Sequence, residues 1–195
     1  AKTENGYKLD LTTENVAEII SKNKFKNKRT VFLPFTSKYH DNNINQLRLP
    51  KTKGGEIIFS DGMKVQINIK QKQITFLQNS EFDWALVKNA NLDEWKILFK
   101  GLAVVKKINQ IDYERLNKYG MTGCLNFYKV HFKSTSLIAN RGFCEDTINI
   151  INSSGIIENI EILDAFSDGL DLDFSKMKVK KIVVKNAGND CMDVS

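Results

Sequence analysis

Carboxylates at a fixed spacing are the side chains of this sequence best suited to chemistry. Asp171 and Asp193 are 22 residues apart, and Asn149 precedes Asp171 by the same interval. Asp173 follows Asp171 by two residues. If the interval brings carboxylates within about 5 Å, two full charges repel by roughly 1 kcal/mol in water and about 3 kcal/mol at an intermediate dielectric. Such a column needs backbone N–H donors, lysines, a cation or a shared proton.

Each way of relieving this repulsion implies a different role for the column. A shared proton would let Asp171, Asp173 and Asp193 act as general acid and base on a glycosidic bond, and we take them as candidate catalytic residues. A hard cation such as Ca²⁺ would use the oxygens of Asp171 and Asp193, which are the candidate metal ligands. Hydrogen bonds to neighbouring amides, or contact with water, would leave the column structural.

A second column of aspartates shares the interval. Asp146, Asp168 and Asp190 recur every 22 residues, three positions before Asn149, Asp171 and Asp193. Aspartate accepts hydrogen bonds from backbone amides and is favoured in turns. We therefore interpret this second column as structural.

Other side chains could complete a site that binds sugars. Lys181 could serve as the base or positive group that a lyase needs opposite a uronate, and we include it among the candidate catalytic residues. Asn149, Arg141 and Trp95 are the candidate substrate-binding residues, Trp95 by stacking on a sugar ring. The apolar neighbours of Trp84 and Trp95 equally predict that both rings are buried in the core.

The interval of 22 residues is itself a structural repeat. Ile148, Leu170 and Met192 share it, and residues 157–162 match residues 179–184 in the same way. Apolar and polar residues alternate within each copy, which predicts short strands. Turn sequences such as Ser-Ser-Gly and Asn-Ala-Gly separate them. Because one copy cannot bury its apolar row alone, the copies must stack as coils about 4.8 Å apart.

These rows, turn residues and Asp-rich coil starts resemble the right-handed parallel β-helix of pectate-lyase-like, galacturonase-like and epimerase-like proteins. The resemblance covers about residues 122–195 and extends back to about residue 45. It implies an all-β fold, an extracytoplasmic location and a bacterial or acidic polysaccharide as partner. An enzyme of this kind would be a polysaccharide lyase, a glycoside hydrolase or an epimerase. The last coil is also similar to β-helical regions of bacterial envelope proteins, which implies a non-catalytic structural or recognition module instead.

We expect one domain over residues 1–195. Residues 1–44 form a cap region with a short helix over about 13–22, residues 45–121 form early coils with an insertion at 109–121, and residues 122–195 form regular coils. The last coil has no capping residue after it, which indicates a fragment of a longer chain. A further segment, or a second copy of the chain, is expected to cover that coil.

Composition narrows the classes of partner. The 29 Lys and Arg exceed the 23 Asp and Glu, and the excess of positive charge lies in residues 1–135. The hypothesis that the chain binds nucleic acid has this basic half as its only support. Because the lysines are scattered and arginines few, we expect a solvated surface and no nucleic-acid partner. No apolar run approaches the ~18 residues of a membrane-spanning helix.

Three cysteines are too few for a disulfide scaffold. Cys144 and Cys191 are two coils apart, too far for a bridge. Cys124 and Cys144 are one coil apart and could pair. We expect all three to be small buried residues.

Overall fold

The computed structural model describes residues 2–3, 6–7, 44–50, 52, 54–102, 117 and 119–195. These residues are all-β, and among them no helix is long and apolar enough to cross a membrane. The short strands β1 (Lys2–Thr3) and β2 (Gly6–Tyr7) pair with each other. The helix expected over residues 13–22 lies outside the described residues, as does most of the insertion expected at 109–121.

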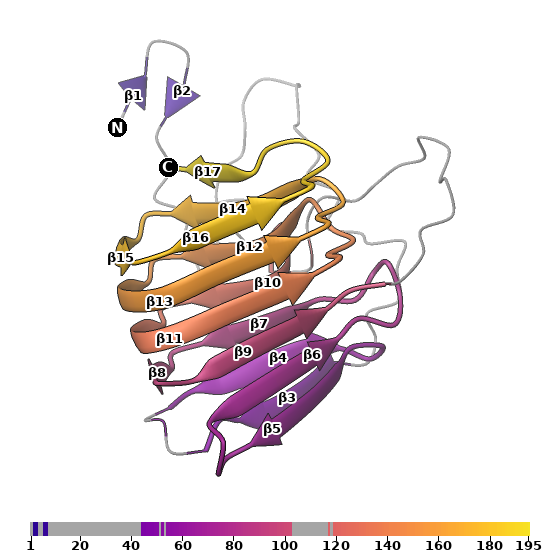
Figure 1. Ribbon diagram of the computed structural model, residues 1–195, viewed down its shortest axis with the longest axis vertical. Coiled ribbons are helices and arrows are strands. Elements are labelled where there is room, and N and C mark those ends of the chain that lie inside the picture. The colour runs from indigo at the N-terminus through magenta and orange to yellow at the C-terminus, as the bar shows by residue number, and fades with distance from the viewer. Residues whose placement is uncertain are drawn as a thin grey trace, which may run out of the picture.

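The remaining strands form two sheets wound as a parallel β-solenoid of about five turns (Figure 1). In order along the chain, the seven-stranded sheet contains β3 (Ile44–Arg48), β4 (Glu56–Ser60), β7 (Ala85–Lys88), β10 (Gly123–Tyr128), β12 (Asp146–Ile151), β14 (Asp168–Asp173) and β17 (Met192–Val194). The eight-stranded sheet contains β5 (Lys64–Asn68), β6 (Gln73–Leu77), β8 (Asn91–Asp93), β9 (Lys96–Lys100), β11 (His131–Asn140), β13 (Ser154–Leu163), β15 (Lys176–Val179) and β16 (Ile182–Lys185).

Strand register confirms the repeat predicted from the sequence. Leu170 pairs with Ile148 on one side and with Met192 on the other, each 22 residues away. One coil earlier the interval is 23 residues, since Leu125 pairs with Ile148. Leu125, Ile148 and Leu170 are almost completely buried, so each coil covers the apolar row of the previous one.

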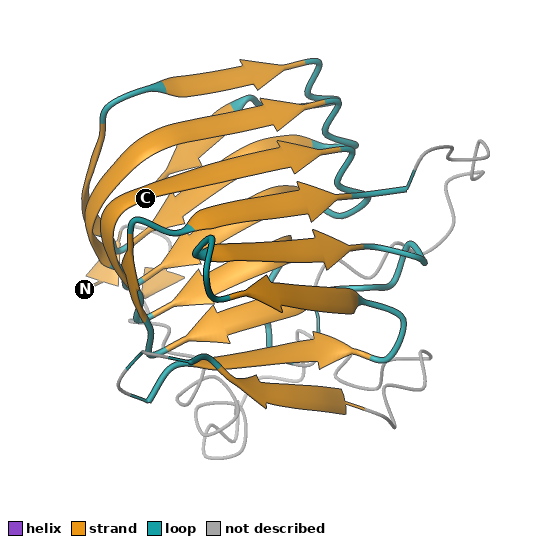
Figure 2. Ribbon diagram, turned by 60° about the horizontal axis from the view of Figure 1, so that its bottom comes forward, coloured by secondary structure: helices purple, strands orange, loops and turns teal. Residues whose placement is uncertain are grey.

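The first strands depart from the parallel coils expected from about residue 45. β3 pairs antiparallel with β4, β4 with β7, and β5 with β6. Parallel winding begins where β9 pairs with β6 and β10 pairs with β7. Only residues 69–72 join β5 to β6, too few for the crossover of about a dozen residues that a parallel neighbour needs. The strand therefore folds back, and antiparallel strands form this end of the solenoid (Figure 2).

The corner between the two sheets repeats a left-handed backbone conformation. Lys129, Asn152 and Phe174 have φ values of 53°, 47° and 49° and each follows the last residue of a strand of the seven-stranded sheet. A single residue in this region turns the chain sharply, and asparagine tolerates it better than most. The same turn in successive coils keeps the coils in register.

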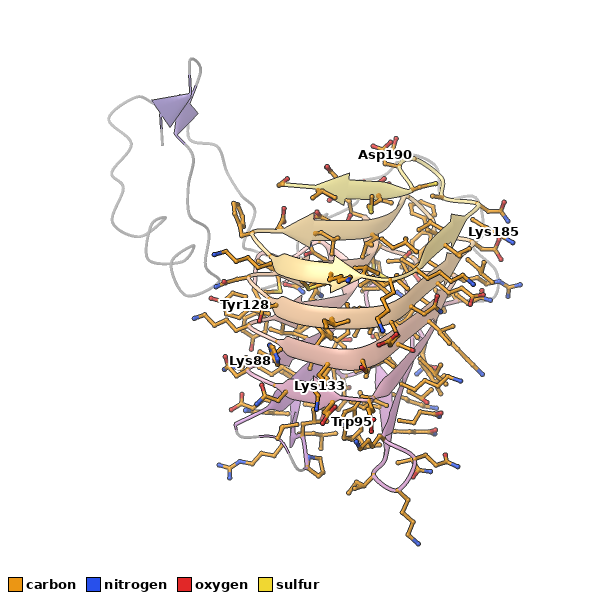
Figure 3. All side chains as sticks on the ribbon, turned by 60° about the vertical axis from the view of Figure 1, so that its left-hand side comes forward. Lys88, Trp95, Tyr128, Lys133, Lys185 and Asp190 are labelled. Carbon is orange, nitrogen blue, oxygen red and sulfur yellow. A yellow bond between two sulfur atoms is a disulfide. The ribbon has the colours of Figure 1, made fainter. Side chains whose placement is uncertain are left out.

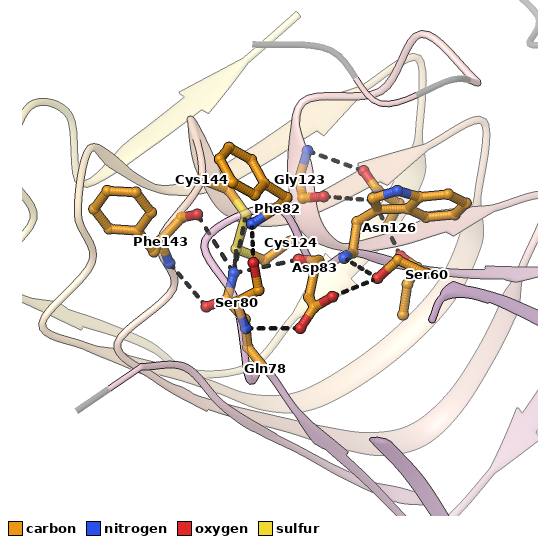
Figure 4. Close-up of a disulfide and its surroundings, with 12 residues drawn as sticks. Ser60, Gln78, Ser80, Phe82, Asp83, Gly123, Cys124, Asn126, Phe143 and Cys144 are labelled. Carbon is orange, nitrogen blue, oxygen red and sulfur yellow. Dashed lines mark hydrogen bonds between the residues drawn. A yellow bond between two sulfur atoms is a disulfide. The ribbon is translucent and has the colours of Figure 1, made fainter. Parts of the chain in front are cut away.

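A disulfide joins two consecutive turns of the solenoid (Figure 4). Cys124 in β10 and Cys144 before β12 are bonded, with 5.5 Å between their Cα atoms. Nε2 of the buried Gln78 lies 3.4 Å from one sulfur and 3.7 Å from the other. The expectation of three small buried cysteines was therefore wrong, because the next turn of the solenoid brings Cys144 beside Cys124. Cys191 is free and exposed.

Candidate functional site

The expected carboxylate column belongs to a longer row on the outer face of the seven-stranded sheet. Successive strands contribute one residue each, and the row changes from apolar to amide to carboxylate along the solenoid. We call it the outer row, and its members in order of strand pairing are Ile58, Leu86, Asn126, Asn149, Asp171 and Asp193. Its polarity therefore increases toward the C-terminal end.

The apolar end of the outer row is covered by residues that precede β10. Met121 packs with Ile58, Trp84 and Leu86 in a second hydrophobic cluster, separate from the interior of the solenoid. Tyr119 meets Trp84 edge to face, with 5.5 Å between ring centroids. This cluster shields the outer face of β4 and β7 from water.

Asn126 is the first polar member of the row, and every polar atom of its side chain is used. Oδ1 accepts a hydrogen bond of 3.0 Å from the backbone amide of Gly123. Nδ2 donates to the carbonyls of Gly123 and Ala85 at 2.6 Å and 3.0 Å. Because the side chain is completely buried and satisfied, its role is to hold β10 against β7.

Asn149 connects the amide part of the row to the carboxylates. Its Nδ2 lies 2.8 Å from Oγ1 of Thr122, 3.3 Å from Oδ2 of Asp171 and 3.5 Å from Oδ2 of Asp146. The residue is 2% exposed, and its Oδ1 has no hydrogen-bond partner among the described residues. Asn149 was expected to bind substrate, yet its burial makes it a support for the carboxyl groups.

Asp146 was expected only to cap a turn, but it lies in this site. The side chain is 4% exposed. Burial raises its pKa to about 6, a rise that hydrogen bonds with Thr122 and Asn149 oppose and the charge of Asp168 increases. Asp146 is therefore partly protonated just below neutral pH.

Asp171 and Asp173 lie two residues apart on the outer face of β14. Burial, together with repulsion from Asp173, Asp146 and Asp193, raises the pKa of Asp171 to about 7. Burial also raises the pKa of Asp173, against a hydrogen bond with Ser195. The two side chains lie two residues apart on the same face of the strand, so each carboxyl group makes ionisation of the other less favourable. Asp171 is therefore partly protonated near neutral pH and can serve there as a proton donor.

The rest of the corner column behaves as the structural interpretation predicts. Oδ1 of Asp168 accepts hydrogen bonds from the backbone amide of Asp190 and from Nδ2 of Asn189, both at 2.9 Å. Each of these donors lies in the next coil, so Asp168 links two consecutive turns. Asp190 lies in the second of these two turns and is exposed.

The other candidate residues lie away from the carboxylates. Lys181 is exposed just before β16 in the opposite sheet, and Arg141 is exposed at the corner after β11. Trp95 is 4% exposed in the hydrophobic core, which agrees with the alternative of burial and leaves it unable to stack on a sugar. Figure 3 shows its position near the antiparallel end of the solenoid, far from Asp190. The site therefore contains the predicted aspartates and Asn149 only.

Thr122 and Asp146 are the site residues that sequence reasoning missed. Thr122 is absent from the repeat pattern, and only the fold brings its hydroxyl to Asn149 and Asp146. Asp146 differs from Asp168 and Asp190 because later coils and Thr122 cover it. The position of Asn126, 23 residues before Asn149, could have identified the row one coil earlier.

The described residues do not assemble a metal site. Among them, no group of three or more His, Cys, Asp and Glu side chains is placed to hold a metal ion. The paired positions of Asp171 and Asp193 supply two carboxylates, whereas Ca²⁺ takes about six to eight oxygen ligands.

Comparison with protein-family models, with curated proteins and with solved structures finds no match to this chain. The solenoid assignment rests on the strand pairing described above.

Proposed function

We propose that this chain is a carbohydrate-processing β-solenoid domain that hydrolyses or binds a polysaccharide along the outer face of its seven-stranded sheet. The observation that carries the proposal is the raised pKa of Asp171 on the outer face of β14, with Asp173 on the same face and the exposed Asp193 in the next strand. Glycoside hydrolysis needs one protonated and one ionised carboxyl group on either side of the scissile bond. Asp171, whose pKa is about 7, can supply the protonated form near neutral pH, and Asp193 in the next strand is the candidate second carboxyl group.

The position of the lysines favours hydrolysis over elimination. A lyase acting on a uronate needs a positive group facing the substrate carboxylate. Lys181 belongs to the other sheet, and no ion pair between described residues involves Asp171, Asp173 or Asp193. An acidic polysaccharide would also be repelled by the carboxylates, so a neutral chain is the better substrate.

An extracytoplasmic location belongs to the same proposal. The bond between Cys124 and Cys144 supports it, because disulfides persist in oxidising compartments and are uncommon in reducing ones. Polysaccharides of the bacterial surface would be accessible to the domain there.

The second candidate function is a non-catalytic structural or recognition module of a larger envelope protein. The satisfied side chains of Asn126 and Asp168 favour it, because both hold neighbouring coils together without any substrate. In this case the carboxylate pair would only be a consequence of stacking aspartates in register.

A glycan array followed by a reducing-end assay separates the two functions. The proposal predicts binding to neutral polysaccharides and release of reducing ends, with activity falling as the pH rises above about 7. Asp171→Asn should lower the rate by about 100-fold or more, because it removes the proton donor. Asp93→Asn is a matched control, since Asp93 in β8 is half-exposed and forms a surface ion pair with Lys133.

Binding without turnover, unaffected by Asp171→Asn, would support the recognition module. A protein that neither binds nor cleaves any glycan on the array would contradict the proposal.

A further inference from the structure

Lysines that are scattered along the sequence come together on the outer face of the eight-stranded sheet. We call this surface the lysine face, and it is formed by β5, β6, β9 and β16 with residues 136–140 of β11 and 159–163 of β13, which lie side by side (Figure 1). Coils stack along the solenoid axis and do not cover side chains that point away from it. Five exposed lysines lie on this face or at its border: Lys64, Lys96, Lys100, Lys181 and Lys185.

The positive charge of the lysine face is not neutralised by neighbouring carboxylates. Glu161 is the only acidic residue in the strand segments that form the face. Within the part of the chain that the structure describes, none of the five lysines forms an ion pair. A group of like charges without counter-charges creates a positive local potential, which attracts an anionic partner.

Strand register spreads these charges over an area. Lys96 and Lys100 lie in the same strand, about 13 Å apart at the rise of an extended chain. Lys64 and Lys100 share a row across the strands and are separated by two strand spacings, about 10 Å. Lys185 continues that row three spacings beyond Lys100, about 14 Å away, and Lys96 and Lys181 belong to a second row.

This arrangement discriminates between classes of anionic partner. Duplex DNA carries one charge per about 1.7 Å of its axis, so lysines about 10 Å or more apart would leave most of its phosphates unpaired. Single-stranded nucleic acid stacks its bases on aromatic rings, but the aromatic residues of these strand segments, Phe76 and Phe99, are buried. An extended anionic polymer along one row would leave the other row unpaired. A plane of anionic headgroups can contact both rows at once.

We propose that the lysine face binds the surface of an anionic lipid bilayer as a peripheral contact. Each lysine near such a surface adds a favourable electrostatic contribution, which falls off within a Debye length. Leu98, Ile138 and Val183 point outward between the two rows of lysines, but they are half-buried in the sheet. Because these apolar side chains do not project from the face, the attachment depends on charge and is reversed by salt.

The inference goes beyond the proposed function and does not depend on it. Both sheets pack their inner faces on the same hydrophobic core, so the lysine face and the outer row of aspartates lie on different sides of the solenoid. A domain attached to a membrane through the lysine face would therefore keep Asp171 and Asp193 open to solvent.

Sedimentation of the full 195-residue chain with lipid vesicles gives the first test. We expect binding to vesicles of equimolar phosphatidylcholine and phosphatidylglycerol, little binding to phosphatidylcholine alone, and release at high salt because the charges are screened. Lys96→Glu with Lys100→Glu should weaken binding by at least about tenfold. The matched control is Lys96→Arg with Lys100→Arg, which retains both charges and should bind as tightly as the wild type.

Site-specific labels test the orientation of the bound protein. In a Cys191→Ser background the disulfide leaves no free cysteine, so a new cysteine can be labelled alone. A fluorophore at Asn140→Cys, an exposed position of the lysine face, should be shielded from a soluble quencher by anionic vesicles. The same fluorophore at Gln46→Cys, exposed in β3 of the other sheet, should stay accessible. Asp171→Asn should leave vesicle binding unchanged, which separates this inference from the proposed hydrolysis.

Circular dichroism and thermal unfolding verify that each variant is folded. A wild-type chain that does not bind anionic vesicles at low salt overturns the proposal. So does binding that the folded Lys96→Glu, Lys100→Glu variant retains, or equal shielding of the two labels. Binding to polygalacturonate or duplex DNA without binding to vesicles would assign the lysine face to a linear polyanion and would likewise overturn the proposal.

Discussion

Nδ2 of Asn149 lies 3.3 Å from Oδ2 of Asp171, one coil further along the solenoid. The same nitrogen lies 3.5 Å from Asp146, so a buried amide connects a corner carboxyl to a strand carboxyl. An amide can donate two hydrogen bonds but cannot neutralise two negative charges. The site therefore retains protons that exposed aspartates would lose at the same pH.

The raised pKa of Asp146 predicts that the folded protein loses stability as the pH rises. Below about pH 4 the carboxyl group is protonated in both states, so it contributes no difference. Between about pH 4 and pH 6 the unfolded chain ionises first and the folded state binds more protons, which lowers the free energy of unfolding with rising pH. The loss from this one group is about 2–3 kcal/mol and is complete above about pH 7.

Urea unfolding of the wild type and Asp146→Asn at pH 4 and pH 8 measures this effect. The variant should gain stability relative to the wild type at pH 8, because it carries no buried charge. The pH-dependent part of the difference should disappear at pH 4. A constant difference between the two proteins at both pH values would be inconsistent with the raised pKa.

The side chain of Asn126 should be one of the largest polar contributors to stability. Asn126→Ala leaves the amide of Gly123 and the carbonyls of Gly123 and Ala85 without their partner in a fully buried position. We expect a loss of ~2–4 kcal/mol in the free energy of unfolding. Asn140→Ala, at an exposed position at the end of β11, is the matched control and should change it by less than about 0.5 kcal/mol. Equal effects of the two substitutions would refute the structural role of Asn126.

The disulfide should be important for the unfolding temperature but not for the fold. Replacing Cys124 and Cys144 by serine opens a loop with a sequence separation of 20 residues, which costs about 3 kcal/mol in the chain-entropy description. Thermal unfolding should move to a lower temperature, while Cys191→Ser should leave it unchanged. Thiol titration of the oxidised protein should count one reactive cysteine of three, and three reactive cysteines without reduction would exclude the bond.

Much of the solenoid follows from the sequence because its geometry repeats. A residue and its counterpart 22 positions later meet across one strand spacing, so the apolar identity of Ile148, Leu170 and Met192 was enough to predict their pairing. The antiparallel strands of residues 44–77 lack this repeat. Whether these strands run parallel or antiparallel depends on the length of the loops between them, such as residues 69–72. A search for sequence repeats does not consider loop length.

The candidate site was only partly predictable for a related reason. The sequence identified Asp171, Asp173 and Asp193 from spacing, but burial could not be inferred from a strand position alone. Asn149 is buried, and its hydrogen bond with Thr122 comes from a residue outside the repeat. The sequence likewise left the bond between Cys124 and Cys144 open, because a separation of 20 residues is slightly less than a full coil and pairing also depends on how the chain turns into β12.

The raised pKa of Asp171 is the central claim about this site, and carboxyl ¹³C NMR tests it most directly. A titration of the Asp171 side chain from pH 3 to pH 9 should give a midpoint near 7. Asp173→Asn should lower that midpoint, because the repulsion between the two carboxylates is removed. A midpoint near 4 in the wild type, unchanged by Asp173→Asn, would contradict the account.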